Sequence, residues 1–231
     1  MKFENTEVWG FEHAIRGMRN PMNSWDKSDS RYLTVNETAW HPCDDGLQKG
    51  FVIGENDLKL IQKLIRAGSE HRKFLRQIFV SVDITAPLYW WKEFDTYKIG
   101  TVANSTSTMH KIHAKKFVLN DFAHEFLTTD YDMGWSYNGV LDFIIDALNN
   151  AREHYLETKD KMWWWQMIQI LPSSYNQTRT VTMNYENILS MYRQRKNHKL
   201  NEWSGLDDPT LDNFVCWVRS LPYSNELILS E

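Results

Sequence analysis

The fold is decided by the stretch Ile78-Phe79-Val80-Ser81-Val82-Asp83-Ile84-Thr85-Ala86-Pro87-Leu88-Tyr89-Trp90-Trp91, near the middle of the chain. Apolar residues recur at every second position from Ile78 to Ile84, which predicts a β-strand with one buried face. Pro87 can then begin a helix in its first turn, where the missing N–H costs nothing. We expect this helix to run to about Lys98, before Gly100. The residues expected to face the core from it are Leu88, Trp91 and Phe94.

Other segments complete an α/β pattern. Helices are expected from Asn56, which can cap its helix, to Gly68 as the C′ residue, over 137–170 and 183–195, and from Asp208-Pro209 onward. The hydroxyl-rich residues 101–109 indicate a loop or a short strand. Residues 1–54 contain scattered Gly, Pro, Asn and Ser, so they are expected to be mostly irregular. The length fits one domain over residues 1–231.

Charge and cysteine content narrow the class of protein. The net charge of -4 argues against general nucleic-acid binding, which needs a basic face. Cys43 and Cys216 are too few for a disulfide framework and indicate a reducing compartment, so we expect a cytoplasmic protein. No apolar stretch reaches the length of a membrane-spanning helix, and we do not expect the protein to bind a membrane. The 11 Trp, 11 Phe and 10 Tyr suit a core, a subunit interface or stacking on a planar ligand.

Metal and nucleophile motifs are weak. His41 and Cys43 lack a second ligand pair, and His110, His113 and His124 follow no standard zinc spacing. We interpret these histidines as ordinary polar residues. Neither cysteine has an obvious histidine base beside it, which argues against a cysteine nucleophile. The sequence therefore predicts no metal site.

The polar segment from Lys92 to His110 is the main candidate for a working region. Its first part, with Glu93, Tyr97 and Lys98, forms the charged end of the expected helix, and its second part is rich in Thr, Ser and Asn. A charged helix end beside a hydroxyl-rich strand can form a pocket for an anion or a nucleotide. The alternative is a solvated helix face followed by a polar loop.

The order of several landmarks resembles that of the flavin-dependent thymidylate synthases over most of the chain. That family has a helix beginning at a proline, an Arg-Gln-Trp stretch, an Arg-His-Arg signature and a Gly-Ser-x-Asn-Glu-x-Ser-Thr-Arg-Tyr run. Residues 87–98 fall on the helix and the signature, and residues 100–110 fall on the run with one inserted residue. Leu171-Pro172 matches the family's Leu-Pro. Residues 184–195 have the spacing of its Asn-x-Arg helix, which ends in a functional arginine.

Weaker likenesses lie at both ends. His13-Ala14-Ile15-Arg16 looks like the family's N-terminal Ala-Arg strand, and residues 60–69 look like the helix before its His-x-Ser-Pro-Phe-Glu-His turn. Phe74 keeps the phenylalanine of that turn, and Glu202-Trp203 is similar to the family's Gln-Trp-Glu. The argument rests on the shared order and the near-constant spacing of all these matches.

The signature region 87–110 is degenerate. The family's Arg-His-Arg is Thr96-Tyr97-Lys98 in this chain, and the glutamate and arginine of the later run are Ser105 and Met109. The arginine two residues after the helix asparagine is Glu186. In the family these arginines bind the flavin and the nucleotide phosphate. Lysine can replace arginine as a point charge but not as a fork of donors.

The resemblance implies a fold, a reaction and a set of site residues. The implied fold is a single α+β domain of the thymidylate synthase-complementing type, with a central, mostly antiparallel sheet flanked by long helices. Residues 171–203 would supply the C-terminal helix of the site. The implied reaction passes a one-carbon unit from methylenetetrahydrofolate to C5 of dUMP or a related nucleotide, with FAD as the cofactor and NADPH as the hydride source. In the family the sites lie between subunits of a homotetramer, so a tetramer or a dimer is expected.

Roles carried over by position fall into three groups. The catalytic residues would be Arg195 and Lys98. The substrate-binding residues would be Lys92, Glu93, Ser105, Ser107 and Arg195. The cofactor-binding residues would be His71, Arg72, Tyr97, Lys98, Asn104 and Asn184.

Three alternatives remain open on the residues alone. The protein could modify another pyrimidine, as an enzyme of a virus or mobile element, which the lost arginines favour over the standard reaction. It could be a non-catalytic descendant that binds a nucleotide or a partner protein. An aromatic single-strand binder is disfavoured by the acidic net charge.

Overall fold

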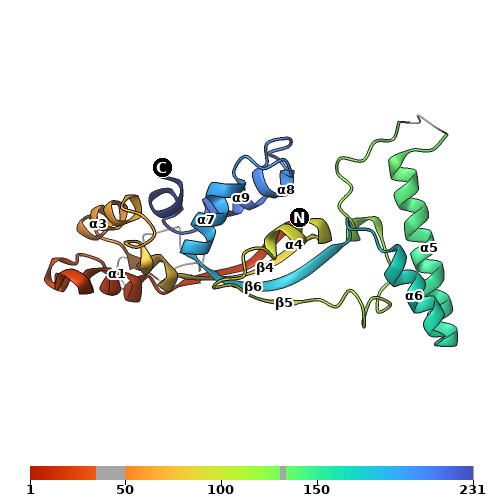
Figure 1. Ribbon diagram of the computed structural model, residues 1–231, viewed down its shortest axis with the longest axis horizontal. Helices are drawn as coiled ribbons and strands as arrows, with labels where there is room; N and C mark the ends of the chain where they lie inside the picture. Colours follow the sequence, from red (N-terminus) through yellow and green to blue (C-terminus); the bar gives the residue numbers. More distant parts are fainter. Residues whose placement is uncertain (35–49, 131–133, 231) are drawn as a thin grey trace. The chain divides into compact units, whose positions relative to one another are not determined.

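The computed structural model describes residues 1–34, 50–130 and 134–230 of the chain. Within these ranges one sheet has the strand order β1 (Lys2–Trp9), β4 (Phe79–Pro87), β6 (Asn176–Asn184), β5 (Val102–Ser105), as Figure 1 shows. A separate antiparallel pair is formed by β2 (Arg31–Tyr32) and β3 (Phe51–Val52). The expected α+β class with an antiparallel sheet is confirmed.

Side-chain contacts between the two central strands give their direction. Thr85 Oγ1 lies 2.8 Å from Thr178 Oγ1, and Thr180 donates to Asp83 at 2.6 Å. Residue numbers rise along one strand as they fall along the other, so β4 and β6 run antiparallel.

The helices are connected by short 3₁₀ turns and loops. The helix bounds are α1 Phe11–Arg19, α3 Glu55–Arg66, α4 Leu88–Phe94, α5 Tyr137–Thr158, α6 Lys161–Ile170, α7 Tyr185–Arg195, α8 Asn201–Ser204 and α9 Phe214–Ser220. The 3₁₀ turns cover Asn20–Met22, Trp25–Lys27, Lys73–Gln77 and Leu119–Asp121, and a π-helical turn covers Asn225–Leu229. No described helix is long and apolar enough to cross a membrane.

The chain, expected as a single domain, forms two compact units. Unit 1 consists of Met1, Thr85–Thr96 and Ser105–Arg179, and unit 2 consists of Lys2–Ile84, Tyr97–Asn104 and Thr180–Glu231. The expected signature region is therefore divided, because residues 97–104 belong to unit 2 and its two flanks belong to unit 1.

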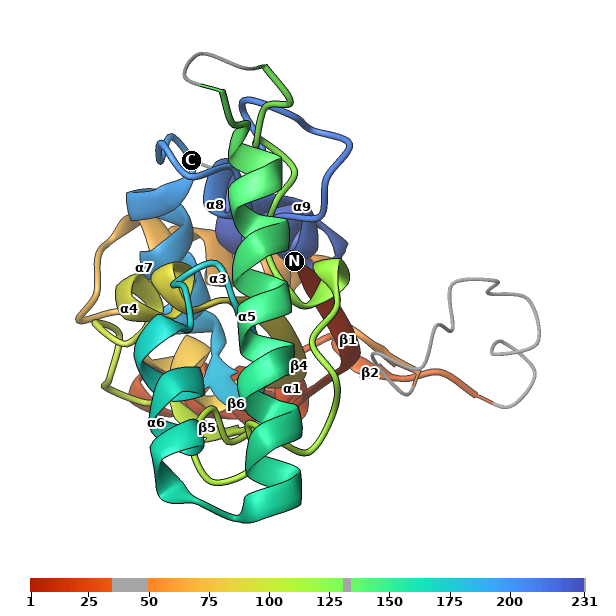
Figure 2. The same ribbon diagram turned by 90° about the vertical axis from the view of Figure 1, so that its right-hand side faces the viewer.

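Unit 1 is built on the hairpin of α5 and α6, which lie side by side (Figure 2). Its core contains the buried residues Ile112, Phe117, Phe122, Leu141, Ile145, Leu148, Ala151 and Met167. The expected helical region 137–170 is thus confirmed, with one break. Lys159 adopts a positive φ of 59°, and the Asp160 carboxylate then accepts the N–H of Met162 at 2.9 Å to cap α6. Val140, in the first turn of α5, lies at the surface.

Unit 2 contains a buried ion pair, in which the carboxylate is fully shielded from solvent. Arg19 Nε donates to Asp57 Oδ1 at 2.6 Å, and the two side chains are 5% and 0% exposed. The other carboxylate oxygen accepts hydrogen bonds from Ser28 Oγ at 2.7 Å and Ser30 Oγ at 2.6 Å, and from the N–H groups of Asp29 and Ser30. Burial alone would raise the pKa of Asp57, but these hydrogen bonds hold the pKa below its usual value. We call this set the Asp57 network.

The deciding stretch forms the expected strand and helix, and of the residues expected to face the core Trp91 and Phe94 are buried, whereas Leu88 is partly buried and Trp90 is buried. Val80, Val82 and Ile84 are buried on one face of β4, and Pro87 lies at the N-cap of α4. The helix ends at Phe94 and not near Lys98. The chain turns there because Thr96 N–H and Oγ1 both bind the carbonyl of Glu93.

The N-terminal part is more regular than expected. Residues 1–54 include the eight-residue strand β1 and the helix α1. The expectation of an irregular segment is therefore wrong for residues 2–19. His13–Arg16 belongs to α1 and is not a strand. The helix buries one face, with Phe11, Ala14, Ile15 and Met18 in the core, and Val8 is the one buried residue of β1. His41 and Cys43 lie outside the described residues.

Two further boundaries differ, because the helix start is capped by another polar group than the expected one. The carboxylate of Asp29 accepts the N–H groups of Asn56 and Asp57, so α3 begins at Glu55 without Asn56 as its cap. Asp208 closes a turn on Thr210, and the last helix begins after Asn213, whose side chain accepts the N–H of Cys216.

The third difference concerns the region 171–203. It was expected as a helix of the site, yet it contains the strand β6 before α7. The nine residues of β6 are mostly Asn, Gln and Thr, which hide the strand pattern, although Val181 and Met183 are buried. Gly68, by contrast, follows α3 with φ +107°, as a C′ glycine should.

Candidate functional site

The site in unit 2 is organised by the N-terminus of α7. Asn184 Oδ1 accepts the N–H of Asn187 at 3.0 Å, and Asn187 Oδ1 accepts the N–H of Asn184 at 3.2 Å, which forms a capping box. Asn187 also donates its side-chain amide to the carbonyl of Ile99 at 2.7 Å. The helix cap therefore holds the loop of residues 97–101 in place.

Gly100 lets that loop approach the cap closely. Its φ is +76°, and a Cβ atom at this position would lie 3.1 Å from both Asn184 Nδ2 and Asn187 Oδ1. Glycine adopts this φ without steric cost and leaves room for the two amides. Thr101 Oγ1 donates to the carbonyl of Tyr97 at 2.6 Å and closes the loop. The loop thus presents Tyr97 in a fixed position.

Tyr97 contacts the C-terminal end of α7. Its hydroxyl accepts a hydrogen bond from Arg195 Nε at 2.8 Å and donates one to Gln194 Oε1 at 3.1 Å. The Arg195 guanidinium lies over two rings, 5.6 Å from the centre of Tyr97 and 5.3 Å from that of Trp203. Trp203 in α8 is fully buried, so this side of the arginine is enclosed. We call Tyr97, Gln194, Arg195 and Trp203 the Tyr97 cluster.

A partly enclosed guanidinium held by aromatic rings is suited to bind an anion. A guanidinium is a planar fork of hydrogen-bond donors that can also stack on aromatic rings. Such a fork matches a phosphate or a carbonyl-rich base. The cluster therefore has the chemistry of a binding site for a planar, anionic ligand.

A second arginine nearby in unit 2 is occupied by an acid. Arg72 Nε lies 2.9 Å and 3.2 Å from the two carboxylate oxygens of Glu186, the second residue of α7. The two side chains are 10% and 15% exposed. Burial and the charge of Arg72 lower the pKa of Arg193, while Glu186 raises it. Arg72 therefore forms a structural ion pair with Glu186. Glu186 is the residue at the position where the flavin-dependent thymidylate synthases have an arginine.

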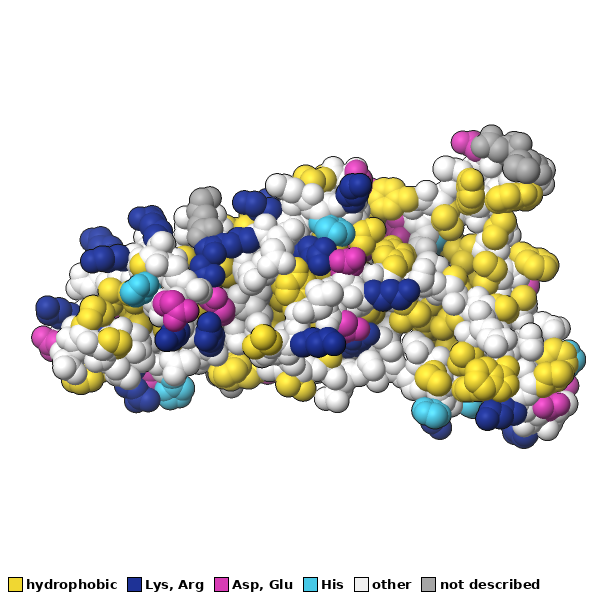
Figure 3. All heavy atoms as spheres, in the orientation of Figure 1, with side chains coloured by type: hydrophobic (Ala, Val, Ile, Leu, Met, Phe, Trp, Pro, Cys, Tyr) yellow, Lys and Arg dark blue, Asp and Glu magenta, His cyan; other side chains and the backbone are white. Residues whose placement is uncertain are grey.

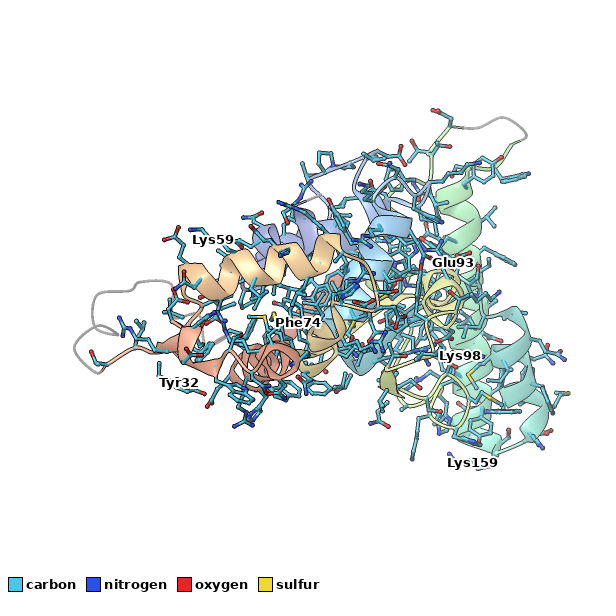
Figure 4. All side chains as sticks on the ribbon, turned by 60° about the vertical axis from the view of Figure 1, so that its left-hand side comes forward. Tyr32, Lys59, Phe74, Glu93, Lys98 and Lys159 are labelled. Atoms are coloured by element: carbon cyan, nitrogen blue, oxygen red, sulfur yellow. The ribbon has the colours of Figure 1, made fainter. Side chains whose placement is uncertain are left out.

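Of the remaining predicted residues of unit 2, three lie at its surface and Asn184 does not. His71, Lys98 and Asn104 are exposed, and Figure 4 labels Lys98 on the loop that follows α4. Asn184 is buried, and its Oδ1 is used by the helix cap, so only its amide group could donate to a ligand. The structure thus brings Tyr97 and Arg195 together and gives Arg72 and Asn184 structural partners.

The predicted residues of unit 1 have different surroundings. Lys92 is exposed on α4, Glu93 beside it is partly buried, and Ser105 is exposed at the end of β5. Ser107 Oγ accepts the N–H groups of Met109 and His110 at 3.3 and 2.9 Å, so its hydroxyl oxygen shapes a turn.

Unit 1 also contains a cluster that the sequence did not predict. Arg179 of β6 donates from Nη1 to Asp95 Oδ1 at 2.7 Å and from Nη2 to the other oxygen at 3.4 Å. Its guanidinium lies 4.1 Å from the ring centre of Trp91, whose indole N–H binds the carbonyl of Gln177. These contacts join α4 to β6, and their partners are too far apart in sequence to be recognised locally.

Two residues of unit 2 were also missed by sequence reasoning. Asn187 lies three residues after Asn184, and that spacing of a capping box was a usable signal. Gln194 had no signal, because its contact with Tyr97 exists only once the loop and α7 pack together.

Metal chemistry finds no support among the described residues. No group of three or more His, Cys, Asp or Glu side chains in these ranges could hold a metal ion. His113 packs its ring against Tyr155 at 4.9 Å. Burial, followed by the charges of Lys111, Lys159 and Arg152, lowers the pKa of His113.

Comparison with known proteins gives a fold likeness. A crystal structure of the flavin-dependent thymidylate synthase ThyX from Helicobacter pylori, complexed with FAD and dUMP, matches with a TM-score of 0.64 and 18% identity, covering 100% of this chain and 99% of that one. A second structure of the same protein with FAD and dUMP matches at a TM-score of 0.64 and 19% identity, covering 100% and 98%. No protein-family model matches the chain, and no curated protein matches it. At this identity the likeness shows the fold.

Proposed function

We propose that the protein is a divergent flavin-dependent thymidylate synthase-like enzyme that transfers a methyl or one-carbon unit to C5 of a pyrimidine nucleotide, dUMP or a related one. The observation that carries the proposal is the Tyr97 cluster. Tyr97 stands at the centre of the degenerate signature and Arg195 at the place of the family's functional arginine, and the two residues are in contact at 2.8 Å. Full-length likeness to an enzyme solved with FAD and dUMP supports it.

The residues of unit 2 suggest how the ligands would be held. Arg195 would bind the nucleotide phosphate or polarise a carbonyl of the base, and Tyr97 would keep its guanidinium in place. Lys98, exposed on the same loop, would add a positive point charge. FAD, when bound, would supply the hydride-transfer chemistry, with NADPH and methylenetetrahydrofolate as co-substrates. Ser105, Ser107, Lys92 and Glu93 are proposed for substrate binding, and His71, Asn104 and the amide of Asn184 for cofactor binding.

The ion pair of Arg72 and Glu186 favours a second candidate function. A carboxylate at position 186 disfavours a phosphate there, and it engages Arg72. This observation favours a protein of the same fold that binds a nucleotide or a partner protein without catalysis. It also favours a changed substrate, such as another modified pyrimidine of a virus or mobile element.

Assembly into a homotetramer or a dimer is part of the proposal. Large apolar side chains gather on unit 1 around α5 and α6, where Figure 3 shows yellow side chains close together. They include Tyr137, Val140, Phe143, Met162 and Trp165, and Phe143 is 74% exposed. Exposed patches of this kind are typical of interfaces. We expect this face to bind a second copy in the cytoplasm.

Self-association can be tested by changing one residue of that face. Phe143→Glu places a charge on the apolar surface and should convert the assembly to monomers, while Asp142→Ala, at the neighbouring exposed position, should leave it unchanged. Light scattering coupled to size-exclusion chromatography gives the mass. A wild-type protein that is already monomeric would contradict the assembly.

The reaction itself has a direct assay. Purified protein is incubated with FAD, dUMP, methylenetetrahydrofolate and NADPH, and dTMP is measured by mass spectrometry. We expect a yellow protein that forms dTMP, or a methylated form of another supplied pyrimidine nucleotide. Protein that binds FAD and nucleotide without turnover would favour the non-catalytic alternative, and protein that binds neither would contradict both.

A further inference from the structure

Basic side chains of unit 1 gather around His113, close to the C-terminal end of α5. Arg152 Nε donates to the carbonyl of His113 at 2.9 Å, and the ring of Tyr155 packs against the imidazole with 4.9 Å between the ring centres. Lys159 Nζ lies 5.9 Å from the centre of the same tyrosine ring, and Figure 4 labels this lysine at the end of α5. Two cations of α5 therefore flank one histidine.

The turn that contains His113 adds a third cation. The N–H of Ala114 binds the carbonyl of Lys111 at 2.9 Å, which closes the turn. Burial lowers the pKa of His113 first, and the charges of three basic side chains lower it further, which shows that all three act on one imidazole. We call Lys111, His113, Arg152, Tyr155 and Lys159 the His113 cluster.

The carboxylates of α5 lie on another side of the helix. Arg152, Tyr155 and Lys159 follow the spacing i, i+3, i+7, which places them on one side. Glu153 and Glu157 are exposed, and each stands one or two positions out of that register. Residues at such spacings do not face each other on a helix. The acidic residues of α5 therefore leave the positive charge of the cluster in place.

Two further carboxylates close to the cluster in sequence are engaged elsewhere. Asp160 Oδ1 accepts the N–H of Met162 at the start of α6, at 2.9 Å. Asp121 Oδ1 accepts a hydrogen bond from Lys115 Nζ at 2.5 Å. The C-terminal end of α5 adds a partial negative charge of about half a unit, which three full positive charges outweigh. The cluster is therefore electropositive.

These side chains are suited to hold a multivalent oxyanion. Lys111 and Lys159 are exposed and Arg152 is partly exposed, so the three cations are within reach of a ligand from solvent. Their N–H groups form strong charge-assisted hydrogen bonds with phosphate oxygens. Nδ1 of His113 is buried and has no hydrogen-bond partner among the described residues. A nearby anion would favour the protonated form of this ring.

We propose that the His113 cluster binds the diphosphate group of a small molecule, with its oxygens held by Lys111, Arg152 and Lys159. The convergence of three cations from a turn and a helix on one imidazole carries this assignment. Free diphosphate and a nucleoside diphosphate offer the same group. The site lies in unit 1 and does not depend on the proposed reaction.

The imidazole itself reports the binding. The pKa of His113 is measured by NMR on the full chain, at matched ionic strength, with and without pyrophosphate, and the signal is assigned from His113→Gln. Pyrophosphate should bind with a Kd on the order of 1 mM or tighter. It should raise the pKa of His113 by about 1, because the anion favours the charged ring.

A second titration with ADP identifies the source of the group. Binding of ADP that is tighter than that of pyrophosphate by about tenfold or more would assign a nucleotide, and weaker or equal binding would assign free diphosphate. Either result supports the site. If neither probe moves the pKa of His113, the proposal is overturned.

Variants then locate the binding. Lys159→Gln should weaken pyrophosphate by about tenfold, because one charge-assisted contact is lost. Lys161→Gln is the matched control, since it removes the same charge from an exposed lysine that lies over Trp164 and Trp165 at 5.8 and 5.7 Å, and it should bind as the wild type does.

Folding of each variant is checked by its Tm. If Lys159→Gln does not fold, Lys111→Gln, in the exposed turn, takes its place. A folded chain with either substitution that binds pyrophosphate like the wild type would overturn the proposal. Equal weakening by Lys161→Gln would overturn it as well, because binding would then follow total charge and not the cluster.

Discussion

Arg19 and Arg195, two arginines of unit 2, have different surroundings. Arg19 is buried, its Nε is paired with Asp57 at 2.6 Å, and its outer nitrogens donate to Ser24 and to the carbonyl of Lys27. Arg195 is partly buried, lies over two aromatic rings and donates from Nε to a neutral phenol. The charge of Arg19 is balanced by a buried carboxylate, and Arg195 lies against the aromatic side chains of the Tyr97 cluster.

This difference teaches how a structural arginine can be told from a binding one. A guanidinium that is satisfied by a buried carboxylate contributes to stability and has no charge to offer a ligand. A guanidinium that lies over aromatic rings is held in orientation by contacts that carry no negative charge. Arg72 belongs with Arg19 by this criterion, because Glu186 neutralises it.

The largest expected loss of stability comes from breaking the Asp57 network. Asp57→Ala leaves Arg19 buried without its partner, and removing one side of a buried pair costs about 3–5 kcal/mol. Urea unfolding followed by circular dichroism gives the free energy of unfolding. Glu55→Gln is the matched control, because it breaks the exposed pair of Glu55 and Lys59 in the same helix and should cost less than about 1 kcal/mol. Similar losses in both variants would contradict the assignment of Asp57.

The same network predicts acid sensitivity. The pKa of Asp57 is lower in the folded chain than in an unfolded one, because hydrogen bonds to the charged form outweigh the effect of burial. Its stabilising contribution is present above the unfolded pKa of about 3.9 and is lost as the pH falls through the folded pKa. The free energy of unfolding of the wild type should therefore fall below about pH 4 more steeply than that of Asp57→Ala. Parallel curves for the two proteins would show that Asp57 contributes nothing to this slope.

An intermediate effect comes from reversing the second ion pair. Glu186→Arg alone places two positive charges together and should destabilise unit 2 by about 2–3 kcal/mol. Combining it with Arg72→Glu restores an ion pair and should recover much of that loss, which a double-mutant cycle measures. On the proposed function, the double variant also regains an arginine at position 186, so FAD or dUMP should bind more tightly. Unchanged binding in a stable double variant would show that position 186 does not face the ligand.

The smallest effect sharpens the description of the Tyr97 cluster. Tyr97→Phe removes the hydroxyl that binds Arg195 and keeps the ring beneath the guanidinium. Loss of one hydrogen bond of this kind is worth about 1 kcal/mol, so ligand affinity should fall by roughly fivefold with Tm shifted by only a few degrees. Gln194→Ala, which removes the acceptor of the phenol's proton and a hydrogen bond to Ser190, should have a smaller effect. If both variants bind like the wild type, the phenol does not position Arg195.

The parts of the fold that were predictable are those with a local cause. The period of two from Ile78 to Ile84 predicted β4, because alternate burial depends on the strand itself. Gly68 predicted the end of α3 for the same kind of reason. The start of α3 was not predictable, because its cap is the carboxylate of Asp29, which is 27 residues away from Asn56. The strand β6 was hidden by its polar composition and becomes a strand through its neighbours in the sheet.

The candidate site shows the same limit. Spacing within the chain singled out Tyr97 and Arg195, which are 98 residues apart and in contact in the structure. Spacing could not show that Glu186 neutralises Arg72, since that pair joins positions 114 residues apart. Nor could it show that Ser107 and Asn184 use their oxygen atoms to hold a turn and a helix cap. These contacts depend on tertiary packing.

The central claim is that Arg195 is the ligand-binding arginine of unit 2, and one titration tests it most directly. FAD and then dUMP are titrated into the wild type and into Arg195→Gln, with flavin fluorescence as the signal and Tm as the check on folding. We predict binding by the wild type and at least about a hundredfold weaker binding by Arg195→Gln, because two charge-assisted hydrogen bonds are lost, with Tm within a few degrees. Equal affinities, or an unfolded Arg195→Gln chain, would place Arg195 with Arg19 as a structural residue and contradict the claim.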